Sequence, residues 1–158
     1  MSIQEGKPAP AFTLEDQSGK AVSLADFAGK KHVLVYFYPR DDTPGCTKEA
    51  CGFRDDLAAF QKLGVVVLGV SGDGAESHQK FIARYKLPFP LLSDPDRKVM
   101  TRYGAFGEKL MYGKKTTGVI RSSVLIGKDG KVLRHWPRVA SAEKHPAQVL
   151  EVAKELLG

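Results

Sequence analysis

The clearest hydrophobic pattern in the chain is a pair of continuous apolar runs, with a stripe of apolar residues at helical spacing between them. The runs Val33 to Tyr38 and Val65 to Ser71 are rich in β-branched and aromatic residues, as is typical of strands covered on both faces. The stripe consists of Phe53, Leu57, Phe60 and Leu63. Its spacing predicts a helix over Thr47 to Leu63. A strand, a helix and a strand in this order predict a βαβ unit with two parallel strands.

Shorter elements are predicted before and after this unit. They are a ribbon of Ala11 to Leu14 with Ala21 to Leu24, a helix over Ala75 to Tyr85, a short strand over Phe89 to Leu92, a short helix from Asp94 through Tyr103, a hairpin of Ser122 to Ile126 with Val132 to Trp136, and a helix over Ala147 to Leu157. The stretch from Gly104 to Gly118 contains four glycines, so we predict a loop there.

This order of elements is typical of an α/β protein with a thioredoxin-like fold. Such a fold has a central mixed β-sheet flanked by helices, here with an N-terminal β-ribbon extension. With 158 residues, 42% of them hydrophobic, the chain is long enough to bury a continuous core. Residues 1–158 are therefore predicted to form a single domain.

The net charge and the N-terminal sequence indicate which partners and which cellular compartment to expect. The net charge is +6, but the basic residues are not interleaved with aromatic ones, so we expect no nucleic-acid partner. The first residues lack the basic start and apolar stretch of a secretory signal, and no apolar run is long enough to cross a membrane. We therefore expect a cytoplasmic protein with no membrane partner. In the cytoplasm a pair of cysteines is more often catalytic or redox-active than a permanent cross-link.

Cys46 and Cys51 are the two cysteines of the chain. They follow the first apolar run after a turn rich in proline and glycine, which predicts that Cys46 lies in the first turn of the helix. Unpaired N–H groups and the helix dipole favour a thiolate there. In a helix, residues five positions apart have Cα atoms roughly 8–9 Å apart, whereas a disulfide needs about 7 Å or less. Bonding the two sulfurs would require local unwinding, which Gly45 and Gly52 would ease.

This arrangement suits a sulfur that reacts first with another molecule. A thiolate that attacks a peroxide becomes a sulfenic acid, which then condenses with a second thiol. Thr43 lies three residues before Cys46, close enough for its hydroxyl to bond the sulfur or a bound oxygen. Pro39 and Pro44 stiffen the loop and help to screen the thiolate from water. A guanidinium from elsewhere would keep the sulfur anionic, since arginine stays protonated.

The residues around Cys46 resemble those of peroxiredoxins. Pro39-x-x-x-Thr43-x-x-Cys46 is similar to the active-site motif of that family. The segment Gly-Cys-Thr-Lys-Glu-Ala-Cys, which ends at Cys51, is similar to its bacterioferritin comigratory protein or peroxiredoxin Q branch. The resemblance also covers Gly6 to Phe12, Val70-Ser71, Phe89 to Asp94 and Gly118 to Ser123.

The resemblance implies a thiol-dependent peroxidase of the atypical two-cysteine type, acting in antioxidant defence. It implies that Cys46 is the peroxidatic cysteine, that Cys51 resolves it through an intramolecular disulfide, and that Thr43, Pro39 and Arg121 bind the peroxide or the thiolate. The substrates would be hydrogen peroxide and organic hydroperoxides. The reductant would be thioredoxin or a glutaredoxin-like donor, with no cofactor and no metal, and the chain would be a monomer or a weak dimer.

At three places the resemblance assigns no role or the sequence departs from the family pattern. Glu49 matches a recurrent acidic position whose role it leaves open. Ser123-Val124 stands where a hydroxyl residue and an aromatic would be common. Ala105-Phe106 lacks the tryptophan expected before Gly107. The two departures affect substrate packing or dimer contacts rather than the sulfur chemistry.

Other interpretations of the cysteines stay open. They could be inert thiols, since free cysteine often behaves as a small apolar residue. A metal site needs about four ligands, and the histidines have no ligand-like spacing; they are His32, His78, His135 and His145. A dithiol–disulfide oxidoreductase on the same fold would use Cys-x-x-Cys. A binding or chaperone module would not depend on Cys46 at all.

Overall fold

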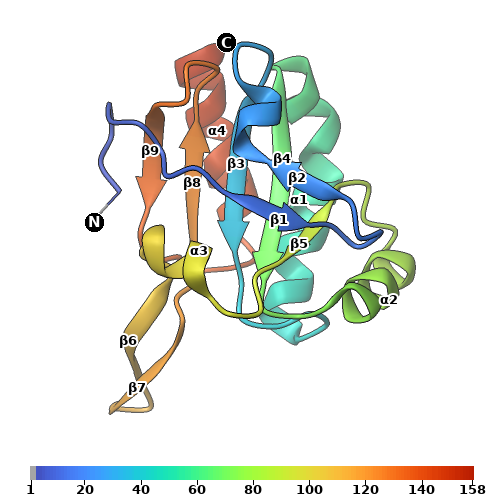
Figure 1. The fold of residues 1–158 in the computed structure, drawn as a ribbon, viewed down its shortest axis with the longest axis vertical. Coiled ribbons are helices and arrows are strands. Elements are labelled where there is room, and N and C mark those ends of the chain that lie inside the picture. The colour runs from blue at the N-terminus through green and yellow to red at the C-terminus, as the bar shows by residue number, and fades with distance from the viewer. Residues whose placement is uncertain (1–2) are drawn as a thin grey trace.

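The computed structural model describes residues 3–158. In chain order its elements are β1 (Thr13–Glu15), β2 (Ala21–Ser23), η1 (Leu24–Phe27), β3 (His32–Phe37), α1 (Pro44–Lys62), β4 (Val65–Ser71), α2 (Ala75–Tyr85), β5 (Leu91–Ser93), α3 (Lys98–Arg102), β6 (Phe106–Met111), β7 (Lys114–Val119), β8 (Ser122–Ile126), β9 (Val132–Trp136) and α4 (His145–Leu157) (Figure 1). None of the helices in residues 3–158 combines the length and apolar character that crossing a membrane requires.

A seven-stranded mixed sheet, in the order β2-β1-β5-β4-β3-β8-β9, forms the centre of the fold. β3 and β4 pair in parallel, as do β4 and β5. The predicted βαβ unit is therefore confirmed. β8 runs antiparallel to β3, and β9 to β8, which confirms the predicted hairpin of Ser122 to Ile126 with Val132 to Trp136. The ribbon of β1 and β2 joins the sheet at β5.

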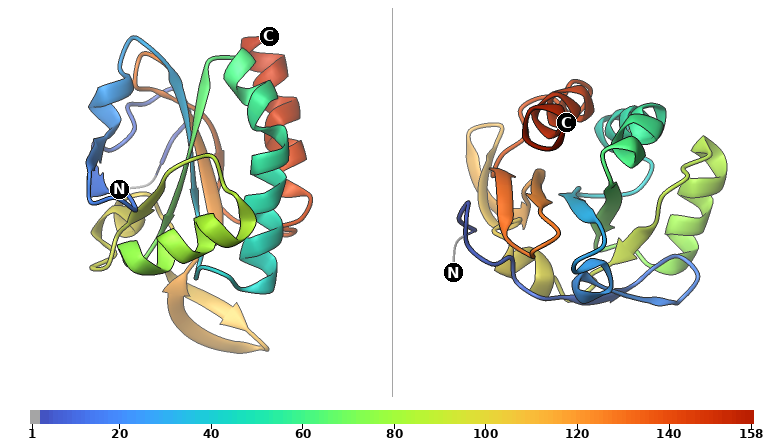
Figure 2. Two further views of the ribbon diagram at one scale, coloured as in Figure 1. Left: turned by 90° about the vertical axis from the view of Figure 1, so that its right-hand side faces the viewer. Right: turned by 90° about the horizontal axis from the view of Figure 1, so that it is seen from above.

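Helices cover both faces of this sheet (Figure 2). α1 and α4 lie on one face, and α3 and η1 lie on the other. Alternate residues of a strand point to opposite faces, so Leu34 and Tyr36 of β3 pack in the core under α1 and α4. Val35 and Phe37 pack in the core under α3. This burial on both sides explains why β3 appears in the sequence as a continuous apolar run.

α1 begins at Pro44, which follows the extended residue Thr43 at the N-cap. Proline fits this first position because the backbone N–H that it lacks would have no helical partner. A Cβ atom on Gly52 would come within 2.7 Å of Cγ of Pro146 in α4. Gly52 thus lets α1 and α4 approach closely. That it also eases unwinding stays a prediction.

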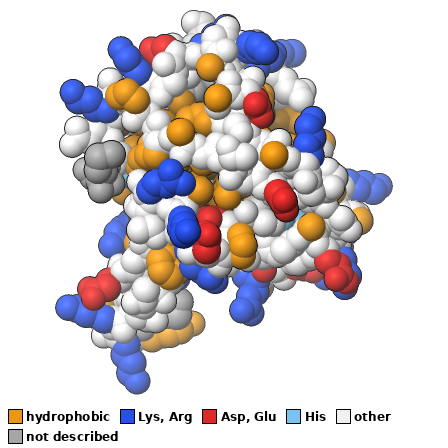
Figure 3. Space-filling model, in the orientation of Figure 1, with side chains coloured by type: hydrophobic (Ala, Val, Ile, Leu, Met, Phe, Trp, Pro, Cys, Tyr) orange, Lys and Arg blue, Asp and Glu red, His pale blue; other side chains and the backbone are white. Residues whose placement is uncertain are grey.

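The predicted loop over Gly104 to Gly118 is wrong, because β6 and β7 form a two-stranded hairpin there. The hairpin projects from the body (Figure 1), so it lacks the buried apolar face by which strands are recognised in a sequence. Its turn residues Tyr112 and Gly113 have φ angles of 54° and 79°, positive at both central positions as in a two-residue hairpin turn. Basic and hydrophobic side chains gather on the projection (Figure 3), and Tyr112 is 98% exposed.

Candidate active site

The loop of residues 38–43 connects the carboxyl end of β3 to α1 and places Cys46 in the first helical turn. Cys46 is 1% exposed. Cys51 lies farther along the same helix and is partly exposed, and both cysteines are free. Because α1 is continuous from Pro44 to Lys62, the two sulfurs are held apart in this state, as the helix geometry predicted.

Arg121 reaches the sulfur of Cys46 from the neighbouring strand. It directly precedes β8, and β8 pairs with β3, which brings its side chain beside the start of α1. Nη2 of Arg121 donates a hydrogen bond to Sγ of Cys46 at 3.2 Å. A Cβ atom on Gly45 would lie 3.3 Å from the same nitrogen, so glycine leaves room for this contact. The guanidinium places a permanent positive charge beside the sulfur.

Glu49 binds the other arm of the same guanidinium. Nη1 of Arg121 donates to Oε1 of Glu49 at 2.7 Å, and Glu49 is fully buried. Burial raises the pKa of Glu49 to about 7, against the opposing effect of Arg121. Burial by itself would lower the pKa of Arg121, but the charges of Glu49 and Cys46 raise it overall. One guanidinium thus serves two acidic groups, of which Glu49 titrates near neutral pH.

Thr43 and Pro39 lie in the loop before α1, and the hydroxyl of Thr43 is bonded away from the sulfur. The hydroxyl of Thr43 donates to the carbonyl oxygen of Arg40 at 3.1 Å. The predicted bond from Thr43 to the sulfur is therefore not formed in this structure. Pro39 is exposed and lines an open hollow together with Arg97 and Phe106. The screening of the thiolate that was assigned to Pro39 stays a prediction.

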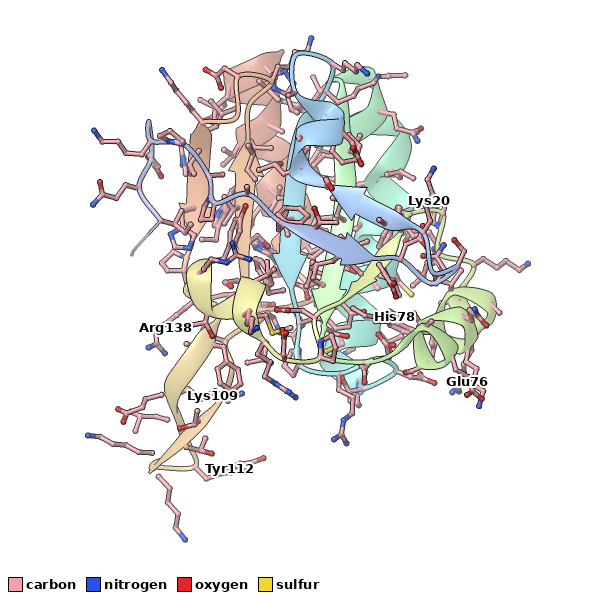
Figure 4. All side chains as sticks on the ribbon, viewed as in Figure 1. Lys20, Glu76, His78, Lys109, Tyr112 and Arg138 are labelled. Carbon is pink, nitrogen blue, oxygen red and sulfur yellow. The ribbon has the colours of Figure 1, made fainter. Side chains whose placement is uncertain are left out.

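Asp41 and Asp42 lie in the turn before the N-cap residue Thr43, and both bind side chains of α2. Nδ1 of His78 lies 2.6 Å from Oδ2 of Asp41. Figure 4 shows His78 on the side of α2 that faces the sheet. No spacing in the sequence signals this pair, since it depends on how α2 packs beside the loop.

A second buried pair lies near Arg121. Nε2 of His145 and Oγ of Ser123 are 2.7 Å apart, and both residues are buried. Burial lowers the pKa of His145 to about 4, and the charge of Arg121 adds to this effect. His145 is therefore neutral at physiological pH and adds no positive charge beside Arg121. In the sequence, His145 is a candidate metal ligand only, because no spacing signals its contact with Ser123. Among residues 3–158, no cluster of three or more His, Cys, Asp or Glu side chains is arranged to hold a metal ion.

The chain matches a protein-family model, curated relatives and solved structures. A model described as the AhpC/TSA family matches residues 5–135. The chain is 50% identical over 150 residues to a putative peroxiredoxin bcp of Coxiella burnetii. This alignment covers 95% of this chain and 98% of that protein. It is 40% identical over 156 residues to peroxiredoxin Bcp of Bacillus subtilis, with coverage of 99% and 98%.

A solved structure also matches the chain along its whole length. The bacterioferritin comigratory protein of Xanthomonas campestris superposes with a TM-score of 0.89 at 35% identity, covering 98% of this chain and 100% of that one. Since the family match and the relatives span nearly the whole molecule, the chain belongs to the AhpC/TSA family, in its bacterioferritin comigratory protein or peroxiredoxin Q branch, and is a peroxidase with a thioredoxin-like fold.

Proposed function

We propose that the chain reduces hydrogen peroxide and organic hydroperoxides with Cys46 as the peroxidatic cysteine. The Cys46 thiolate attacks one peroxide oxygen, the O–O bond breaks, and the leaving oxygen takes up a proton to give water or an alcohol. Cys46 is then a sulfenic acid. Organic substrates are supported by the Xanthomonas campestris relative, whose structure is described for its alkyl peroxide reduction activity.

The proposed second step joins the two cysteines. The sulfur of Cys51 attacks the sulfenic sulfur of Cys46, a disulfide forms, and the hydroxyl group leaves as water. α1 must unwind locally for this step, because the two residues lie too far apart in the helix. The partial exposure of Cys51 supports its role as the resolving cysteine.

Recycling then needs an external dithiol. We propose that thioredoxin, or a glutaredoxin-like donor, supplies two electrons and two protons and restores both thiols. One cycle converts a hydroperoxide and a reduced donor into an alcohol, water and an oxidised donor. The cytoplasmic location and the monomeric or weakly dimeric state stay predictions.

The contact between Arg121 and Cys46 supports the proposal most directly. A guanidinium at 3.2 Å from the sulfur stabilises the thiolate before attack. Its fixed donors also stabilise negative charge that develops on the peroxide oxygens. Thr43 is proposed to turn its hydroxyl from the carbonyl of Arg40 toward the peroxide when substrate binds, and Pro39 to border the entrance.

A coupled assay with thioredoxin, thioredoxin reductase and NADPH tests this function. Cys46→Ser is expected to abolish peroxide consumption, whereas Cys51→Ser is expected to allow one fast turnover without recycling. Full thioredoxin-linked turnover by Cys51→Ser would contradict the resolving role. Reduction of insulin without peroxide consumption would instead favour a dithiol–disulfide oxidoreductase.

A further inference from the structure

The buried pair of Asp41 and His78 fastens the loop before Cys46 to the body of the protein. His78 is fully buried, and its Nε2 lies 3.1 Å from the carbonyl oxygen of Leu92 in β5. A carbonyl oxygen only accepts, so Nε2 is the donor. The remaining proton lies between Nδ1 and Oδ2 of Asp41, which are 2.6 Å apart. Tyr38 and Ser77 donate to the same carboxyl group.

Asp42 adds a second attachment to the same helix. Its carboxylate accepts hydrogen bonds from Nη1 of Arg84 at 2.8 Å and from the hydroxyl of Tyr85 at 2.9 Å. The backbone N–H of Asp41 donates to Asp73. Two consecutive loop residues are therefore bound to opposite ends of α2. None of these contacts involves a sulfur atom.

At the other end of the reactive segment, packing holds α1 in place. Gly52 lies against Pro146 of α4, and the ring of Phe53 stacks on Tyr36 at 4.7 Å between centroids. Unwinding beyond Gly52 would open this part of the core. Like the contacts of Asp41, these contacts do not involve the sulfur of Cys46.

Between these two ends, the buried side chains of Cys46 and Glu49 share one polar partner. Arg121 binds both Cys46 and Glu49. Oxidation of the thiolate to a sulfenic acid removes the negative charge from the sulfur, so the charge-assisted bond from Arg121 weakens. We expect the reaction to loosen residues 43–51, while the contacts at both ends of this segment stay in place.

We propose that Asp41 and His78 are positioning residues that fix the N-terminal limit of unwinding, so that only residues 43–51 open when the disulfide forms. The proposal rests on the Cys46–Cys51 disulfide of the proposed function. It goes further by naming the residues that stop the opening. Residues 38–42 are expected to keep the same conformation in both redox states.

Hydrogen exchange measured by mass spectrometry tests this limit. The protein is compared reduced and after one equivalent of hydrogen peroxide. Oxidation is expected to speed exchange in residues 43–51, while residues 38–42 and 53–62 stay protected. Faster exchange of residues 38–42 in the oxidised wild type would overturn the proposal.

Variants of His78 separate hydrogen bonding from the filling of space. His78→Leu fills the site but cannot bind Asp41, so residues 38–42 of the reduced protein are expected to exchange roughly tenfold faster. His78→Asn is smaller but keeps a donor, so it is expected to restore most of the protection. Glu76→Gln is the matched control, since Glu76 is exposed on the same helix (Figure 4). Equal exchange in His78→Leu and Glu76→Gln would overturn the proposal.

Two further measurements keep the test decisive. If His78→Leu does not fold, Asp41→Asn replaces it, because the amide keeps the shape and loses acceptor capacity toward His78 and Ser77. The same local opening is expected. If peroxide does not remove two hydrogens from the mass of the wild type, the disulfide assignment fails, and the reduced-state comparison still decides whether His78 holds the loop.

Discussion

At the sulfur of Cys46, one guanidinium is shared between two side chains. Arg121 donates to Cys46 and to Glu49 through different nitrogens, and Glu49 carries an oxygen, Oε2, that has no hydrogen-bond partner among the described residues. When Glu49 is protonated, the charge of Arg121 acts mainly on the sulfur. When Glu49 is ionised, it competes for the same charge. We therefore expect protonation of this carboxyl group to change the charge that Arg121 presents to the sulfur.

Replacing Arg121 tests its role at the sulfur. Arg121→Met is expected to slow the reaction of Cys46 with hydrogen peroxide by about 100-fold, the usual effect of removing a donor that stabilises developing charge. Arg121→Lys keeps a positive charge but not the two-armed geometry, so an intermediate rate is expected. Stopped-flow measurement of a single turnover gives both rates, and a wild-type rate in Arg121→Met would contradict the role.

The pH dependence of stability tests the environment of Glu49. Its pKa in the folded protein is about 7, above its ordinary value of 4.5, so the folded state binds this proton more tightly than the unfolded chain does. The free energy of unfolding should therefore fall as the pH rises from 4.5 to about 7, and then level off. Reduced Glu49→Gln should lack this contribution. Urea unfolding of both proteins across this range provides the check, and parallel curves would contradict the buried titration.

At the scale of elements, the sequence pattern predicted the strands that are buried on both faces and the helices that have one apolar face. The apolar residues of β3, β4 and α1 are in the core, and these elements lie within a few residues of their predicted bounds. β6 and β7 were missed because the hairpin projects from the body, and among its described side chains only Phe106 and Val119 at its base pack against the core. Cys46 and Arg121 could be paired from the family motif. Asp41 and His78 could not, because only the packing of α2 brings them together.

The contact between α1 and α4 gives a prediction about Gly52. A Cβ atom there would come within 2.7 Å of Pro146, so Gly52→Ala is expected to lower the free energy of unfolding by about 1–3 kcal/mol. Gly107→Ala is a matched control, since a Cβ atom at Gly107 meets nothing within 4 Å. Urea unfolding under reducing conditions compares the two, and equal stability would show that α4 can move aside.

At the scale of the whole molecule, the sheet brings the site together from distant parts of the chain. The parallel strands β3 and β4 bring the start of α1 to the carboxyl edge of the sheet, and β8 beside β3 delivers Arg121 to the same place. α2 supports the intervening loop from the side. The first turn of α1, which holds Cys46, therefore lies among elements from distant parts of the chain. That residues 1–158 act as a single domain stays a prediction.

The most direct test of the central claim is the mass of the protein after one equivalent of hydrogen peroxide, followed by peptide mapping without reductant. The account predicts a loss of two hydrogens and a single cross-linked pair of peptides joining Cys46 to Cys51. Cys51→Ser should instead gain one oxygen on Cys46. Unlinked peptides in the wild type, or oxygen gained on Cys51 rather than on Cys46, would contradict it.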